Sequence, residues 1–146
     1  MVIKNNSLGA SEDSHSLSYT KDEVYEATLE YFNGDTMLAN IWIDKYCLKN
    51  KQGQYLELTP NDMHERLARE LARIELKYPN PLSYEEIKNL LLDFNYVIPG
   101  GSILYGVGNE YSISSLGNCF VIGNRSDSYG GICQTDQELC QLFKRR

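Results

Sequence analysis

TPNDMHERLARELARIELKY, residues 59–78, is the stretch that best defines the fold. Thr59-Pro60 is a strong start signal, because proline suits the first turn of a helix. Apolar residues then recur every three or four positions, which places them on one face of an α-helix: Met63, Leu67, Leu71, Ile74 and Tyr78. We predict an amphipathic helix here and place His64 on its polar side, as a surface residue.

Signals for further helices lie on both sides of this stretch. A hydroxyl residue followed three positions later by glutamate forms a capping box, which satisfies free amides of a first helical turn. Such boxes begin at Thr20 and Ser83, and Asp35 is a third candidate cap. The chain around Gly53 is predicted to be a loop or short hairpin. Residues 19–95 are therefore predicted to form a helical domain.

The composition changes near residue 95. Residues 1–95 contain 16 acidic and 10 basic side chains, whereas residues 96–146 contain four of each and eight of the 11 glycines. We place a domain boundary here. Residues 1–18 are polar and serine-rich, cannot bury enough apolar surface to order, and are predicted to be a flexible tail.

Residues 96–146 are predicted to contain short strands and one helix. Tyr96-Val97-Ile98 is a short strand signal, and Asn118 to Ile122 is a continuous β-prone run, typical of a strand buried on both faces. A third capping box, Thr135 to Glu138, predicts a helix that continues to the end of the chain. These elements are too few to close a sheet, so we expect a piece of a larger enzyme.

The overall charge argues against several classes of protein. The 146-residue chain has a net charge of −6, which disfavours nucleic-acid binding through Lys and Arg. It has no apolar run long enough to cross a bilayer and no secretory segment at its start, so we expect a cytoplasmic protein. The four cysteines should then be reduced, and their spacing contains no zinc-binding CxxC pair.

Three polar positions could support chemistry. Judged by residue type alone, Cys119 is better explained as a small buried side chain than as a nucleophile. The turn from Asp127 to Gly131 could hold phosphate, although a plain Asx turn is the simpler interpretation. Pro99 to Ser102 is also compatible with phosphate, but it lacks a GxGxxG or Walker motif.

Taken together, four stretches resemble the large catalytic subunit of ribonucleotide reductase. They occur in the same order and spacing as in that family: Ile98 to Leu104, Leu116 to Ile122, Asp127 to Ile132 and Gln141 to Arg146. The helices of residues 20–95 are similar to the family's N-terminal helical domain, which is a weaker match. The resemblance covers most of this chain but only the opening portion of the family's length.

The resemblance implies an α+β chain in which the helical domain is followed by the first strands and helix of a truncated ten-stranded α/β barrel. The family reduces ribonucleotides to deoxyribonucleotides for DNA synthesis by radical chemistry. Cys119 would be the first of two cysteines that supply electrons and become a disulfide. Its partner, the radical cysteine and the catalytic glutamate would lie in sequence beyond this chain, so the fragment would be inactive alone.

The resemblance also implies substrate contacts close to Cys119. Asn118 matches the position that lines the substrate ribose. Gly101 stands where many members have Ser or Thr, so Ser102 or a backbone amide would make that contact here.

A second site is implied for a regulatory nucleotide. Asp127, Ser128 and Tyr129 match the start of the effector-specificity site, which binds a deoxynucleotide near the dimer contact. The helix predicted at residues 135–146 matches one that packs at that interface, so the full enzyme is expected to be a homodimer.

The expected activity is that of a ribonucleoside-diphosphate reductase, with thioredoxin or glutaredoxin as the reductant; a triphosphate substrate stays open. The pattern Pro-Gly-Gly followed by Gly-x-Gly is more similar to the adenosylcobalamin-dependent members, and the cofactor would be bound outside this chain. The alternative is a radical from a separate metal-containing subunit. Two different functions also stay open, a non-catalytic helical interaction module and a small nucleotide-binding domain.

Overall fold

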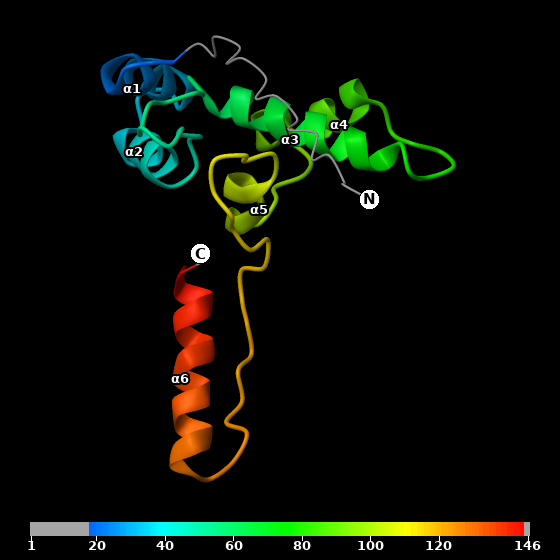
Figure 1. Ribbon diagram of the computed structural model, residues 1–146. Helices are drawn as coiled ribbons and strands as arrows, with labels where there is room; N and C mark the ends of the chain where they lie inside the picture. Colours follow the sequence, from blue (N-terminus) through cyan, green and yellow to red (C-terminus); the bar gives the residue numbers. More distant parts are fainter. Residues whose placement is uncertain (1–17, 145–146) are drawn as a thin grey trace, which may run out of the picture.

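In the computed structural model, which describes residues 18–144, the chain is mostly helical (Figure 1). Six α-helices and one short 3-10 helix follow one another in this part of the chain: α1 (Lys21–Tyr31), α2 (Thr36–Lys45), α3 (Pro60–Glu75), α4 (Tyr84–Leu91), η1 (Leu92–Phe94), α5 (Gly101–Gly106) and α6 (Tyr129–Lys144). The tail predicted at residues 1–18 falls, except for residue 18, outside the described residues.

The predicted helix starts at Thr20, Asp35, Thr59 and Ser83 are confirmed. Thr20 and Ser83 both form complete capping boxes with the glutamate three residues later. The Asp35 carboxylate accepts hydrogen bonds from the amides of Met37 and Leu38, at 2.9 and 3.0 Å. Because these caps satisfy amides that have no partner inside the helix, the helix starts could be read from local sequence.

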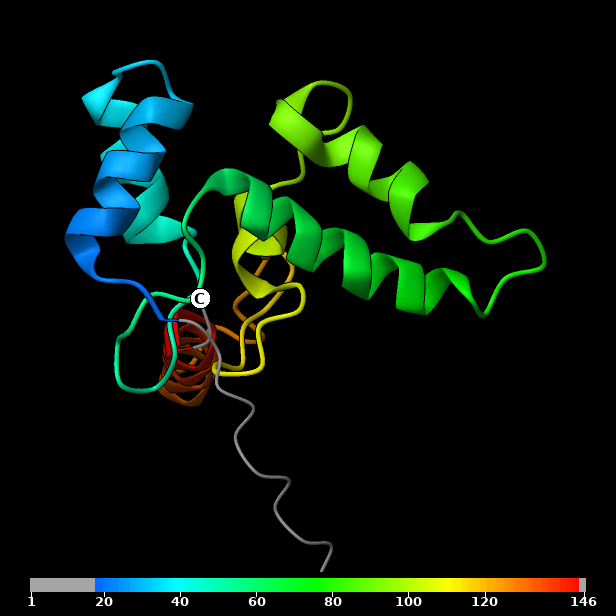
Figure 2. The same cartoon turned by 90° about the horizontal axis from the view of Figure 1, so that it is seen from above.

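Helices α1 to α4 form a helical body with one apolar core. Helix α3 packs along α4, and α1 packs along α2 (Figure 2). Met63 and Leu67 of the predicted stripe are fully buried, and Leu104 of α5 joins the same core. Each buried side chain of this size contributes about 1.5–3 kcal/mol through removal from water.

The prediction that His64 is a surface residue is wrong. Its side chain is fully buried beside Met63 and Leu67 on α3. The ring of Phe94 meets the imidazole edge to face, with 4.5 Å between the ring centroids. The 3-10 helix after α4 therefore covers a part of α3 that the charge pattern assigned to solvent.

The predicted strands do not form within the described residues. The only bridges there are two isolated antiparallel ones, Tyr19–Tyr55 and Lys49–Tyr55. The second closes the predicted hairpin, in which Gly53 adopts a φ of +80° that favours glycine. Residues 96–98 and 118–122 have no ladder partner, because a strand needs a neighbouring strand that residues 18–144 do not supply.

The last helix begins earlier than predicted. Helix α6 starts at Tyr129, so Thr135 lies inside it rather than at its cap. The Thr135 hydroxyl donates to the carbonyl of Gly131 at 3.0 Å, a bond typical of threonine within a helix. Together with the extended chain before it, α6 forms an arm, residues 119–144, that projects from the helical body (Figure 1).

Candidate functional site

The start of α5 is hydrogen-bonded to the chain segment that leads to Cys119. The amide of Ser102 donates to the side-chain oxygen of Asn118 at 2.9 Å, and the Ser102 hydroxyl donates to the carbonyl of Gly117 at 3.2 Å. Two segments that lie 16 residues apart are thereby held together. The contact places Asn118, and with it the following Cys119, beside the helical body.

This contact explains the glycine pair that precedes Ser102. A Cβ atom at Gly100 would collide with the side-chain amide nitrogen, Nδ2, of Asn118. A Cβ atom at Gly101 would lie 3.1 Å from the hydroxyl oxygen of Tyr46, which is tighter than ordinary van der Waals contact. At both positions a side chain from another segment approaches the backbone closely, so a larger residue would have to displace the Asn118 amide or the Tyr46 hydroxyl.

A pocket of about 440 Å³ opens at this junction. The structure brings three of the predicted substrate residues together here, Gly101, Ser102 and Asn118. The remaining lining residues were not identified from the sequence: Lys45, Tyr46, Tyr105, Ser114 and Ser115. They carry no motif, and they come from separate segments: the end of α2, α5 and the chain that follows α5. The lining thus contains several hydroxyls, one amide, one cation and no acidic side chain.

Cys119 follows the lining residue Asn118 in sequence but does not itself line the pocket, and it is exposed, in contrast to the buried position that its residue type favours. Cys47 is buried in the helical body, where desolvation and the nearby Glu57 raise the pKa of its thiol to about 12. A thiol with so high a pKa is a poor nucleophile near neutral pH. Cys133 and Cys140 lie exposed on α6, and residues 18–144 contain no disulfide.

A buried ion pair attaches α5 to the helical body. The Nε of Arg66 on α3 lies 2.7 Å from a carboxylate oxygen of Glu57. The same guanidinium donates to the carbonyls of Leu104, at 2.9 Å, and Val107, at the end of α5. Burial raises the pKa of Glu57, while Arg66 and the amide of Leu48 oppose that rise. Arg66 therefore fixes the C-terminal end of α5 to the helical body.

The three predicted effector residues lie elsewhere, in the turn at the start of α6. This turn is at the far end of the arm from α5 (Figure 1). The Ser128 hydroxyl accepts a hydrogen bond from the amide of Gly131 at 3.1 Å, so serine caps the helix. Asp127 and Tyr129 are exposed. The structure therefore separates these residues from the pocket that contains Ser102 and Asn118.

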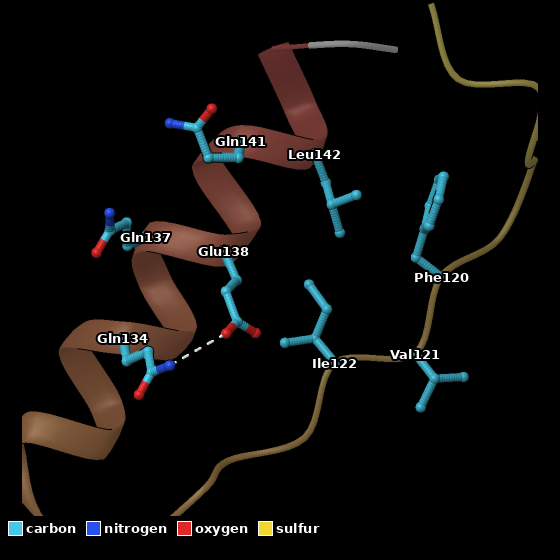
Figure 3. Close-up of a pocket in the computed structure, with 8 residues that line it drawn as sticks. All are labelled: Phe120, Val121, Ile122, Gln134, Gln137, Glu138, Gln141 and Leu142. Carbon is cyan, nitrogen blue, oxygen red and sulfur yellow. Dashed lines mark hydrogen bonds between the residues drawn. The ribbon is translucent and has the colours of Figure 1, made fainter.

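A second, open hollow of about 510 Å³ lies along the arm. The side chains of Phe120 and Ile122 face Leu142 of α6, while Val121 lies on the outer side of the extended segment (Figure 3). Phe120 is 42% exposed, and Phe143 is 75% exposed. This apolar seam is therefore only partly covered by the described residues.

Comparisons of the chain with protein-family models, with curated proteins and with solved structures found no match. No helix in residues 18–144 combines the length and the apolar character needed to cross a bilayer. The same residues contain no cluster of three or more His, Cys, Asp or Glu side chains that could hold a metal ion.

Proposed function

We propose that this chain is the N-terminal part of a ribonucleotide reductase, a cytoplasmic enzyme that converts ribonucleotides to deoxyribonucleotides. The observation that carries the proposal is the bond from Ser102 to Asn118, which forms one polar pocket immediately before an exposed Cys119. Residues chosen by resemblance from two separate stretches thus meet at one site. The volume of the pocket is in the range of small-molecule sites, and Cys119 is the next residue in sequence after the lining residue Asn118, although Cys119 itself does not line the pocket.

The lack of backbone pairing in the extended segment before α6 also supports this proposal. Residues 110–125 make no backbone-to-backbone hydrogen bonds with other described residues, although Asn118 to Ile122 is strongly β-prone. Such unpaired amides and carbonyls are stable in a buried apolar strand only when neighbouring strands pair with them. We propose that later sequence supplies the other strands of an α/β barrel, whose first strand is this segment.

Within the proposal, Cys119 is one of two redox cysteines. As its thiol and a second thiol form a disulfide, they release two electrons and two protons to the substrate, and the 2′-hydroxyl leaves as water. Thioredoxin or glutaredoxin then reduces the disulfide by thiol exchange. Adenosylcobalamin held by sequence outside this chain would supply the initiating radical, with a separate metal-containing subunit as the alternative source.

The proposal is tested by Cys119→Ser in the complete gene product. We expect the variant to lose multiple-turnover reduction of ribonucleoside diphosphates with thioredoxin, because serine cannot form the disulfide. Cys133→Ser is the matched control, since Cys133 is also exposed but lies on α6, and it should retain turnover. Equal turnover by the Cys119→Ser variant and the wild type would remove this residue from the mechanism.

The proposed effector role of Asp127, Ser128 and Tyr129 needs a separate test. We expect Asp127→Ala in the complete enzyme to weaken the dependence of substrate choice on added deoxynucleoside triphosphates, because the carboxylate would accept hydrogen bonds from the effector sugar. Basal reduction should persist, since this turn lies away from α5 (Figure 1), which contributes Ser102 to the pocket. Unchanged control of substrate choice would refute the assignment.

An interaction module is the second candidate function, and the exposed apolar side chains of the arm favour it. Besides Phe143, Val121 and Tyr129 are almost fully exposed. Exposed apolar patches often mark surfaces that bind another chain. The same Cys119→Ser experiment separates the two functions, because a docking surface does not need this thiol.

A further inference from the structure

We propose that Lys45 and Tyr46, at the C-terminal end of α2, bind the phosphate of the nucleotide in the pocket beside Ser102. This inference rests on the proposed function for the identity of the ligand. It assigns to the helical body a direct part in binding substrate, in addition to its role as a support for later segments. Neither residue was singled out by the sequence.

The shape of the pocket brings the end of α2 to the binding site. Lys45 and Tyr46 line it together with Gly101, Ser102 and Asn118. The Tyr46 hydroxyl reaches within 3.1 Å of the point where a side chain at residue 101 would begin. Glycine at that position therefore leaves room for the hydroxyl of a tyrosine from another element, and this hydroxyl can donate to a bound ligand.

The charge of the pocket favours an anionic ligand. Lys45 is the only charged residue in the lining, and it takes part in none of the ion pairs within the described residues. Its ammonium is therefore available as a point charge, which is how lysine commonly binds phosphate. A pocket of about 440 Å³ lies within the range of small-molecule sites. A phosphate ester that also carries sugar hydroxyls fits these groups.

Lys45 also has an ordinary structural explanation. It lies in the last turn of α2, where a cation complements the helix dipole. That role affects the stability of the helix, but it does not distinguish a phosphorylated ligand from the corresponding nucleoside. A comparison of ADP with adenosine therefore separates the two explanations.

The test measures equilibrium binding of ADP and adenosine to the complete gene product. We expect Lys45→Gln to weaken ADP binding by about 10-fold or more, as expected for loss of a hydrogen bond with a charged partner, and to change adenosine binding less than about twofold. Tyr46→Phe should weaken ADP binding by about fivefold. Lys51→Gln and Tyr84→Phe are matched controls, because neither residue lines this pocket.

A third variant tests the contact between Tyr46 and residue 101. Gly101→Ala should weaken ADP binding in the wild type, because its methyl group displaces the Tyr46 hydroxyl. The same substitution should have a smaller effect in the Tyr46→Phe background, where the hydroxyl is already gone. Thermal unfolding of each variant checks that the fold is retained.

The outcomes separate this inference from the proposed function. Failure of the wild type to bind ADP, or ADP affinities of both variants within twofold of the wild type, would overturn the role of Lys45 and Tyr46. If Cys119-dependent reduction persists in that case, only the further inference falls. Weaker ADP binding by Lys45→Gln in a protein without reductase activity would support the phosphate site and reject the reductase.

Discussion

His64 occupies an unusual position for a titratable side chain. It is fully buried on α3, and neither ring nitrogen has a hydrogen-bond partner within the described part of the chain. Desolvation lowers the pKa of the imidazole to about 4, although the negative charge of Asp93 opposes this effect. The folded protein therefore keeps His64 neutral under conditions in which the unfolded chain would protonate it.

The buried imidazole predicts a loss of stability in mild acid. Below pH 6.5 the unfolded chain binds a proton at His64, but the folded protein does so only near pH 4. The free energy of unfolding should therefore decrease as the pH is lowered from 6.5 to 4, by up to about 3 kcal/mol in total. Urea unfolding of the wild type and His64→Leu between pH 7 and pH 4 measures this contribution.

The leucine variant serves as the reference because it fills a similar volume without titrating. Its stability should depend less on pH between 6.5 and 4 than that of the wild type, and the carboxylates shared by both proteins cancel in the comparison. Parallel pH profiles for the two proteins would contradict the burial of a neutral imidazole at this position.

Individual residues were predictable where neighbours in sequence determine their environment. Met63 and Leu67 were assigned to the core because the helical repeat alone places them on one face, and both are buried. His64 was misassigned because Phe94, 30 positions later, covers it. Tyr46 was missed for the same reason, since its proximity to Gly101 depends on how α2 and α5 pack.

At the scale of elements, the buried pair of Glu57 and Arg66 connects α3 with α5. Arg66→Met should destabilise the protein by about 3–5 kcal/mol, because it leaves a buried carboxylate without its partner and frees the carbonyls at the end of α5. Chemical denaturation measures the change. Arg73→Met is the control, since its ion pair with Glu70 is exposed and should add little stability.

A double variant tests whether the two charges act as a pair. Glu57→Gln retains an oxygen that can accept from the amide of Leu48, which donates to Glu57 at 2.8 Å. Combined with Arg66→Met, it should be less destabilising than the sum of the two single changes, because no uncompensated charge stays buried. Strict additivity would mean that the two side chains stabilise the fold independently.

Helices and strands could be predicted from the sequence where residues close in sequence determine them. Thr20, Asp35 and Ser83 each determine a helix start through bonds within three residues. The run from Asn118 to Ile122 has the composition of a strand, yet a strand also needs partners, which residues 18–144 do not contain. The start of α6 was misplaced because Thr135 can bond to a carbonyl one turn earlier as readily as it can cap a helix.

For the whole molecule, the difference between the helical body and the arm leads to the last prediction. In the isolated 146-residue chain, the amides of residues 119–125 should exchange with solvent at nearly unprotected rates, because they make no backbone-to-backbone bonds with described residues. The amides of α3 should exchange slowly, since that helix lines the core. Hydrogen exchange measured by mass spectrometry gives both rates in one experiment.

The same measurement on the complete gene product tests whether the arm belongs to a barrel. Pairing of residues 119–125 with neighbouring strands would slow their exchange by orders of magnitude, because opening would then require disruption of a sheet. The amides of α3 provide the internal reference, since their hydrogen bonds are already formed within the helical body of the isolated chain. Fast exchange of residues 119–125 in the complete protein would place Cys119 on a surface loop, and a thiol there could not serve an enclosed radical reaction.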